Sequence, residues 1–251
     1  MIWSREYIGD MKMYFDRHFS LITGYRFLLK DVIKYIAIID YFFDSKYKIL
    51  DIGCGRKPYK KLLKKSAAKE AGADYVGLDV CECEYANPDI IGNSENIPCD
   101  NSSFDAVMTV FVLDDSFYIK KTFCEISRVL KDGGYYFAFE AQSTSIHNPP
   151  FDFFRFAPNA MIELAKEVNL ELIRYDTYGG DFANVGFGFI SIIRNTLSSL
   201  RLEPLLGPIF YLPINVIFRL LDLIGRLKVF RNKYKNNSLG YFYIFKKVEN
   251  A

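Results

Sequence analysis

The chain has 251 residues and a net charge of +2, which suits one α/β domain with an elaboration. Such a small net charge creates no overall positive field, so we expect no nucleic-acid partner. Half of the residues are hydrophobic and 17% are aromatic, which is more than a plain globular core requires.

The cysteine pattern argues against both disulfides and zinc. The five cysteines are an odd number, and no pair has the Cys-x-x-Cys spacing. Cys81 and Cys83 are too close for a zinc clasp, and we interpret that pair as coincidence. The N-terminus has no apolar run behind a basic start, so we predict no signal peptide. A reducing cytoplasm is the expected location, and no metal site is expected.

Residues 1–46 are predicted to be helical. Apolar residues recur there at spacings of three and four and form one face, namely Phe27, Leu28, Val32, Tyr35, Ile36 and Ile39. We expect this N-terminal segment to act as a cap that packs on the rest of the fold.

The stretch at residues 47–55 predicts a buried strand that ends in a glycine turn. Ile49, Leu50 and Ile52 are residue types that suit a central strand. Gly53 and Gly55 permit backbone angles and a close ligand approach that a side chain would prevent. In doubly wound sheets this turn lies where nucleotide-like ligands bind. The alternative is an ordinary tight turn into a following helix.

The second strand is predicted at residues 73–80, with Asp79 near its end. A carboxylate there can accept hydrogen bonds from both ribose hydroxyls of a nucleoside. Asp79 lies 24 positions after Gly55, close to the ~20-residue offset expected for that role. The alternative is a turn or helix-capping aspartate.

The later segments alternate between strands and helices, which indicates a doubly wound, mostly parallel sheet of seven strands. We predict further strands at residues 88–91, 104–111, 135–140, 171–177 and 239–247, and helices at 116–130 and 158–168. Gly133 and Gly134 are interpreted as the stop of the first of these helices. The core is therefore residues 47–178 and 239–248 of a single domain.

Residues 179–238 are predicted to form an apolar helical insertion between the sixth and seventh strands. Residues 204–218 carry no charge, but the run is short for a bilayer and is interrupted by Pro208 and Pro213. Ile214, Ile217, Leu221 and Ile224 mark one face of a following helix. Four interpretations stay open: a membrane-surface helix, a hydrophobic lid, a homodimer face through residues 200–230, and a cap buried on its own domain.

Five motifs between residues 47 and 140 resemble those of the class I S-adenosylmethionine-dependent methyltransferases, in that family's order. They are the glycine turn at 51–55, the acid Asp79, the polar loop 93–98, the run 100–105 and the run 125–134. The resemblance implies a Rossmann-like methyltransferase fold with S-adenosylmethionine as cofactor. It also implies a cofactor site built from Asp51, Gly53, Cys54, Gly55, Lys57, Asp79, Val80, Asn93, Ser94, Glu95 and Phe111.

Three positions depart from the family pattern. Lys57 stands where the family often has a third glycine, and we expect it to meet the carboxylate of the methionine moiety. Asn93 replaces the usual adenine-edge acid and can still donate or accept a hydrogen bond. A histidine that often follows the fourth strand is replaced by Asp115, which either substitutes for it or caps the next helix.

The loop after the fifth strand carries the candidate catalytic residues. It resembles a run in small methyltransferases of glycan synthesis. His147 titrates near neutral pH and is the candidate base for a hydroxyl acceptor. Asp152 orients His147 or does the same work, and Arg155 holds an anionic acceptor. Alternatively, Asp152 and Arg155 form a pair that fixes the loop.

These features predict a methyltransferase that acts on a small-molecule or lipid- or glycan-linked acceptor and transfers the methyl group to oxygen rather than nitrogen. The enzyme is expected in the cytoplasm or on the inner face of the membrane. One alternative is a catalytically silent fold that acts as a membrane-associated or oligomeric scaffold. A nicotinamide dehydrogenase is disfavoured because its third glycine would fall at Pro58. Methylation of bases is disfavoured because the sequence at 148–151 follows the wrong strand.

Overall fold

The computed structural model describes residues 25–63, 73–144, 146, 149–225 and 238–249. The chain divides into two compact units. One comprises residues 33–176 and 241–251 and contains most of the β-sheet; the other comprises residues 1–32 and 177–240 and contains a pair of long helices. The single-domain organisation expected from the sequence stays a prediction.

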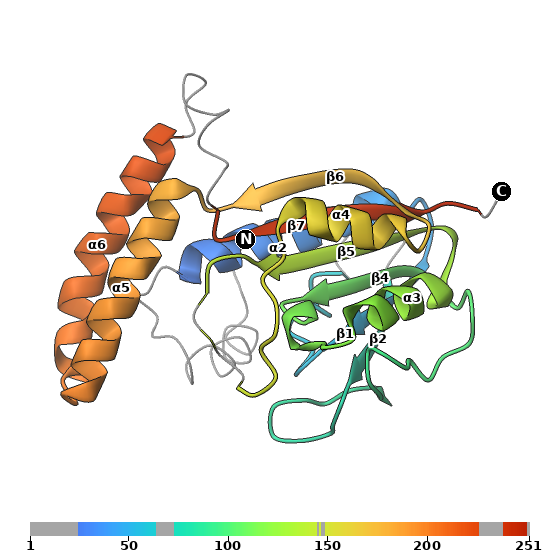
Figure 1. Ribbon diagram of the computed structural model, residues 1–251, viewed down its shortest axis with the longest axis horizontal. Coiled ribbons are helices and arrows are strands. Elements are labelled where there is room, and N and C mark those ends of the chain that lie inside the picture. Colours follow the sequence, from blue (N-terminus) through green and yellow to red (C-terminus); the bar gives the residue numbers. More distant parts are fainter. Residues whose placement is uncertain (1–24, 64–72, 145, 147–148, 226–237, 250–251) are drawn as a thin grey trace. The chain divides into compact units, whose positions relative to one another are not determined.

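Seven strands form one sheet in the order β3-β2-β1-β4-β5-β7-β6 (Figure 1). The strands are β1 (Tyr47–Ile52), β2 (Ala73–Asp79), β3 (Ile90–Ile91), β4 (Phe104–Val110), β5 (Leu130–Ala141), β6 (Leu170–Tyr178) and β7 (Gly240–Lys247). β1 pairs in parallel with β2 and β4, β2 with β3, and β4 with β5. The strand order reverses between β1 and β4, and ligands bind beyond the carboxyl ends of strands at such a point. The predicted doubly wound, mostly parallel sheet is confirmed.

Side chains of β5 alternate between the two faces of the sheet. Tyr136 and Ala138 join the apolar core cluster that includes residues of α3 (Ile119–Val129) and α4 (Pro158–Lys166). Those two helices lie on the same face of the sheet (Figure 1). Phe139 lies beside Tyr35 of α2 (Tyr25–Ile39), with ring centroids 6.3 Å apart. This alternation follows from the pleat of the strand. Because other elements pack on each side, both faces of the strand are buried.

The glycine turn after β1 does not lead into the predicted helix within the described residues. Residues 56–63 form turns, and residues 64–72 lie outside the described part of the chain. Lys57 has a φ of 56°, a left-handed conformation that an α-helix does not contain. Leu63 is nevertheless buried, so the apolar pattern identified a packed residue without identifying its secondary structure.

Gly133 and Gly134 lie inside β5, so the prediction that they stop a helix was wrong. α3 ends at Val129 and β5 begins at Leu130. Gly133 has a φ of 76°, and a Cβ on Gly134 would lie 3.0 Å from the carbonyl oxygen of Asp105. The register between β4 and β5 shifts at this place. The two glycines therefore permit a close irregular pairing at the start of the strand.

The second unit contains two packed helices, α5 (Asp181–Ser199) and α6 (Glu203–Gly225). α6 runs without interruption through Pro208 and Pro213, so the prediction that these prolines break the segment was wrong. Each proline removes one backbone N–H from the helix, which nevertheless continues and packs against α5. The rings of Phe189 and Phe218 stack between the helices, with centroids 5.9 Å apart. In the described part of the chain, no helix has the length and apolar character needed to cross a bilayer.

Candidate cofactor and acceptor site

The turn after β1 is built around two glycines with positive φ. Gly53 and Gly55 have φ values of 69° and 51°. The backbone amides of Gly53 and Cys54 donate to the carbonyl oxygen of Leu78 at 2.8 and 3.0 Å. A Cβ on Gly53 would lie 2.3 Å from Cγ2 of Val112, which leaves no room for any side chain. The turn is therefore held between the end of β2 and the segment after β4.

Asp79 lies against this turn, as the sequence predicts. Its Oδ2 accepts a hydrogen bond from the Gly55 amide at 2.9 Å, and its Oδ1 accepts one from the Val80 amide at 2.8 Å. Each carboxylate oxygen has a second lone pair, so both oxygens retain acceptor capacity for the hydroxyls of a ribose. The next side chain, Val80, is 66% exposed and has an apolar surface for a flat ring.

Asp51 lies in β1, just before the glycine turn. Its side chain is buried, and it accepts a hydrogen bond from the Tyr75 hydroxyl on the neighbouring strand. Burial, with a smaller contribution from the charge on Asp79, raises the pKa of Asp51 to about 8, although the hydrogen bond from Tyr75 acts in the opposite direction. Tyr75 was not predicted as a site residue, because its alternation in β2 marks it only as a core residue. Contact between Asp51 and a cofactor stays a prediction.

Lys57 is paired with an acid that the sequence analysis missed. Its Nζ lies 2.6 Å from Oδ1 of Asp89, and the Gly77 amide donates to Oδ2 of the same carboxylate at 2.8 Å. The ion pair and the amide lower the pKa of Asp89, although burial acts in the opposite direction. The predicted contact of Lys57 with the methionine carboxylate competes with this ion pair and stays a prediction. Cys54 is buried, with Sγ 2.7 Å from where a Cβ on Gly77 would lie.

The polar loop at residues 93–98 is tied to the segment that leads into α3. Asn93 Oδ1 accepts from the Glu95 amide at 2.8 Å, which closes a local turn. Glu95 Oε1 accepts from the Ser116 hydroxyl at 3.1 Å and from the Tyr118 amide at 3.2 Å. Ser94 Oγ lies 3.2 Å from Oγ1 of Thr122. These contacts hold the predicted adenine-edge loop in place, and its cofactor contacts stay predictions.

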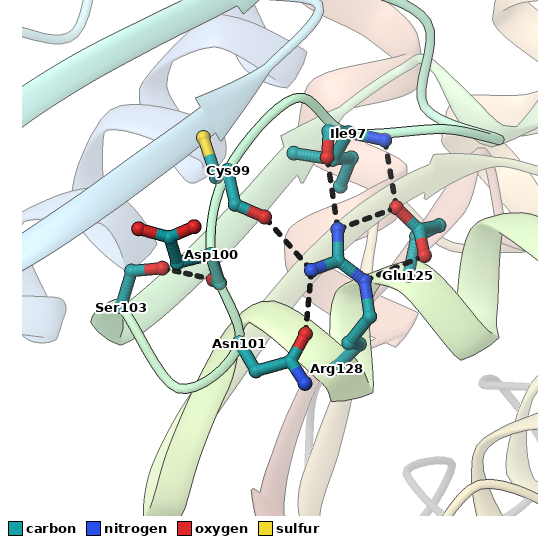
Figure 2. A network of polar contacts seen from close by, with 7 residues as sticks. All are labelled: Ile97, Cys99, Asp100, Asn101, Ser103, Glu125 and Arg128. Atoms are coloured by element: carbon teal, nitrogen blue, oxygen red, sulfur yellow. Dashed lines mark hydrogen bonds and ion pairs between the residues drawn. The ribbon is translucent and has the colours of Figure 1, made fainter.

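Figure 2 shows how Arg128 fastens the other end of this loop. Its guanidinium donates to the carbonyl oxygens of Ile97 and Cys99 and to Oδ1 of Asn101, each at 2.8 Å. Glu125 accepts from Arg128 at 2.7 Å and also accepts from the Ile97 amide at 2.7 Å. Both residues belong to the run 125–134, whose sequence pattern indicated no role for them. Their spacing of three on a helix was the available signal.

On the acceptor side, Asp152 and Arg155 form a close pair. Arg155 donates to both carboxylate oxygens of Asp152, with Nη2 to Oδ2 at 2.9 Å, and its Nη1 lies 3.7 Å from Oδ2 of Asp114. The Phe153 amide donates to the carbonyl oxygen of Asp114 at 2.8 Å. These contacts fix the loop after β5 against the segment after β4. The catalytic roles of Asp152 and Arg155 stay predictions, and His147 lies outside the described residues.

A buried polar group at the ends of β4 and β5 was missed by the sequence analysis. Thr109 Oγ1 lies 2.9 Å from the Tyr136 hydroxyl and donates to Oε1 of Glu140 at 3.3 Å. Burial raises the pKa of Glu140 well above its usual range, and the nearby charge of Asp114 raises it further. Phe111, a predicted cofactor residue, has a φ of 58° at the end of β4.

Three aromatic rings are exposed at the same edge of the sheet. Phe117, Tyr118 and Phe153 are 57%, 55% and 39% exposed. Phe117 contacts both of the others edge to face, with centroids 5.2 Å from Tyr118 and 5.1 Å from Phe153. The two loops that carry these rings are tied together by the Phe153–Asp114 hydrogen bond. The three rings form an apolar surface at the edge of the sheet that also carries the glycine turn.

Comparisons with known proteins agree with this architecture. Residues 50–138 match the family described as a methyltransferase domain. An uncharacterised protein of Methanocaldococcus jannaschii is 29% identical over 135 residues, which are 52% of this chain and 51% of that protein. The chain therefore spans about half the length of the curated relative that it matches.

Solved structures share the fold at low identity. A Galdieria sulphuraria protein described as a sarcosine dimethylglycine methyltransferase aligns with a TM-score of 0.55 and 16% identity, over 87% of this chain and 86% of its own. The cyclase SpnF aligns with a TM-score of 0.53 and 15% identity, over 89% and 81%. A methyltransferase of Methanosarcina mazei aligns with a TM-score of 0.50 and 14% identity, over 85% and 98%. At these identities the likeness establishes the fold.

The matched region is a methyltransferase domain, and the fold is shared with solved methyltransferase structures. They imply S-adenosylmethionine as the cofactor. Asp79 fits that cofactor, because it lies against the glycine turn and both of its carboxylate oxygens retain acceptor capacity for a ribose. Among the described residues, no three His, Cys, Asp or Glu side chains gather into a metal site.

Proposed function

We propose that this chain transfers a methyl group from S-adenosylmethionine to an oxygen of a small-molecule or lipid- or glycan-linked acceptor. The observation that supports the cofactor half is the hydrogen bond between the Gly55 amide and Asp79 Oδ2. It joins the glycine turn and the acid at the carboxyl edge of two adjacent parallel strands, where a nucleoside is bound in this type of sheet.

The bound cofactor supplies an activated methyl group, and the protein's own part is alignment. Asp79 accepts hydrogen bonds from the ribose, and Val80 packs against the adenine. The loop at 93–98 borders that ring. Glu125 and Arg128 hold the far end of this loop in place. Fixing acceptor and methyl group in line can contribute ~7–11 kcal/mol to lowering the barrier.

The acceptor half of the proposal is supported by the rings of Phe117, Tyr118 and Phe153. Their exposed faces suit an acceptor with an apolar portion or the face of a sugar ring. Arg155 is paired with Asp152, so an anionic group would have to compete with that carboxylate. We propose His147 as the base that accepts the hydroxyl proton, because histidine titrates near neutral pH.

Calorimetric titration with S-adenosylhomocysteine tests the cofactor half. We expect the wild type to bind and Asp79→Ala to bind at least about tenfold more weakly, since two charge-assisted hydrogen bonds are lost. Asp74→Ala is the matched control, because Asp74 is an exposed acid of the same strand. A folded wild type without binding would favour the alternative of a catalytically silent scaffold.

We also propose that the helical pair α5–α6 lies on a membrane surface. Leu205, Ile209, Leu212, Val216 and Leu220 follow helical spacing along α6, and each is between 49% and 71% exposed. Val185, Phe189 and Ile192 form a similar exposed row on α5. An apolar stripe of this length on a helix favours the headgroup boundary of a bilayer. Basic residues follow α6 in the sequence, outside the described residues, and suit anionic lipid.

Vesicle flotation tests this membrane proposal. We expect the wild type to float with phosphatidylcholine vesicles that contain phosphatidylglycerol, and a triple variant Leu212→Glu, Val216→Glu and Leu220→Glu to remain at the bottom. Ser198→Glu is the control, since it adds a charge at an exposed polar position of α5. If the wild type does not float but forms a dimer that the triple variant lacks, the stripe is a homodimer face instead.

A further inference from the structure

Cys81 and Cys83 bring their sulfur atoms together in the structure. The Cys81 thiol donates to Sγ of Cys83 at a distance of 2.6 Å, and Cys83 is exposed while Cys81 is partly exposed. The other cysteines are Cys54, Cys99 and Cys124, and all five are free thiols. A disulfide bond has an S–S length of about 2.05 Å, so a small movement separates this contact from a bond.

The surroundings of Cys83 favour its thiolate. The Cys81 thiol and the backbone amides of Tyr85 and Ala86 lower the pKa of the Cys83 thiol. Reciprocal backbone bonds between Cys83 and Ala86, at 3.0 and 3.1 Å, close the turn that presents this sulfur. Low pKa and exposure are the two conditions for a reactive cysteine, and a second thiol in contact supplies the resolving group.

This pair lies on the segment that carries the ribose acid. Asp79 and Val80 immediately precede Cys81, and Asp79 accepts from the Gly55 amide. Beyond the pair, the Arg56 guanidinium donates from Nε to the carbonyl oxygen of Glu84 at 2.9 Å, and the Asn87 amide donates to the carbonyl oxygen of Gly55 at 2.9 Å. The glycine turn therefore holds residues 79–87 at both ends, and a bond inside this segment changes the backbone next to Val80.

We propose that Cys81 and Cys83 are a modification site, which hydrogen peroxide oxidises to an intramolecular disulfide that weakens cofactor binding. The Cys83 thiolate attacks one peroxide oxygen, which forms a sulfenic acid and releases hydroxide. The Cys81 sulfur then attacks the Cys83 sulfur; the S–S bond forms, the S–O bond breaks, and hydroxide leaves. The Cys81 proton and a solvent proton neutralise the two hydroxides. Two thiols and one peroxide thus give one disulfide and two waters, with two electrons passing from sulfur to oxygen.

Formation of the disulfide between Cys81 and Cys83 is tested in the absence of the cofactor. Reduced protein is treated with stoichiometric peroxide, alkylated, digested and weighed. We expect the peptide that contains both cysteines to lose two hydrogens and resist alkylation, while Cys99 and Cys124 remain alkylatable. In Cys81→Ser we expect a sulfenic acid at Cys83 that dimedone traps. A wild-type sulfenic acid that persists, or a disulfide between two molecules, would overturn the proposal. Cys124→Ser is the matched control and should oxidise like the wild type.

The effect on the site rests on the proposed function and is measured separately. We expect peroxide to weaken S-adenosylhomocysteine binding by the wild type at least about tenfold, which is about 1.4 kcal/mol, and dithiothreitol to restore it. Cys81→Ser should bind equally well before and after mild oxidation. Unchanged affinity in fully disulfide-bonded protein contradicts the proposed effect. A lack of binding by reduced wild type contradicts the proposed function and leaves the mass measurement valid.

Discussion

At the scale of single residues, Asp51 links the stability of the fold to pH. Its side chain is buried in β1, where it accepts a hydrogen bond from the Tyr75 hydroxyl. Desolvation favours the neutral carboxyl, which raises the pKa of Asp51 from 3.8 to about 8. The folded protein therefore binds this proton more tightly than the unfolded chain does.

We predict that the Asp51 contribution to the free energy of unfolding is full below about pH 4 and falls as the pH rises to about 8. The unfolded carboxyl ionises in this window while the folded one stays protonated, so rising pH favours unfolding. Asp51→Asn should remove this dependence, and urea denaturation of both proteins across the window measures it. A constant difference in stability between wild type and variant at all pH values would contradict the raised pKa.

Arg128 is the second residue whose role is testable by itself. It joins the loop after β3 to α3 through three carbonyl or amide oxygens and Glu125 (Figure 2). We predict that Arg128→Ala lowers the free energy of unfolding by about 2–3 kcal/mol, because several charge-assisted hydrogen bonds are lost at once. Denaturant unfolding measures the change.

Lys120→Ala on the same helix is the control for Arg128. Lys120 pairs with Glu167 at 2.8 Å, but both side chains are more than half exposed. Exposed ion pairs contribute only about 0–1 kcal/mol. Equal losses in the two variants would show that Arg128 acts as an ordinary surface charge.

At the scale of elements, the packing of α5 against α6 depends on a small residue at one position. A Cβ on Gly186 would lie 2.7 Å from Cγ of Phe218, whereas a Cβ on Gly188 would meet nothing within 4 Å. Both glycines are in α5, so intrinsic helix propensity favours alanine at each by about 1 kcal/mol. The difference between the stability changes caused by alanine at Gly186 and at Gly188 therefore reports the contact between the helices.

We predict opposite effects of alanine at these two glycines. Gly188→Ala should raise thermal stability, because it adds helix propensity without a contact. Gly186→Ala should lower it by about 1–3 kcal/mol, because Phe218 must move. Gly186→Ala combined with Phe218→Leu should recover part of the loss. Thermal unfolding followed by circular dichroism gives all three values, and stabilisation by both single changes would rule out the close packing.

At the scale of the whole molecule, cofactor binding should increase the free energy of unfolding. A ligand that binds only the folded state at 100 times its dissociation constant adds about 2.7 kcal/mol to the free energy of unfolding. We predict this gain with S-adenosylhomocysteine for the wild type and its loss in Asp79→Ala. Chemical denaturation with increasing ligand measures the gain. An increase that persists in Asp79→Ala would place the ligand elsewhere.

The sequence by itself determined the fold class, the positions of most strands along the chain and the association of Asp79 with the glycine turn. These follow from local patterns: apolar segments of strand-forming residues, glycines that readily adopt positive φ, and motifs of fixed spacing. Only the tertiary structure decided that Gly133 lies inside β5, that α6 continues through Pro208 and Pro213, and that Arg128 holds the loop after β3. Each of those outcomes involves contacts with a separate segment of the chain, and a local pattern contains no information about which segment will supply them.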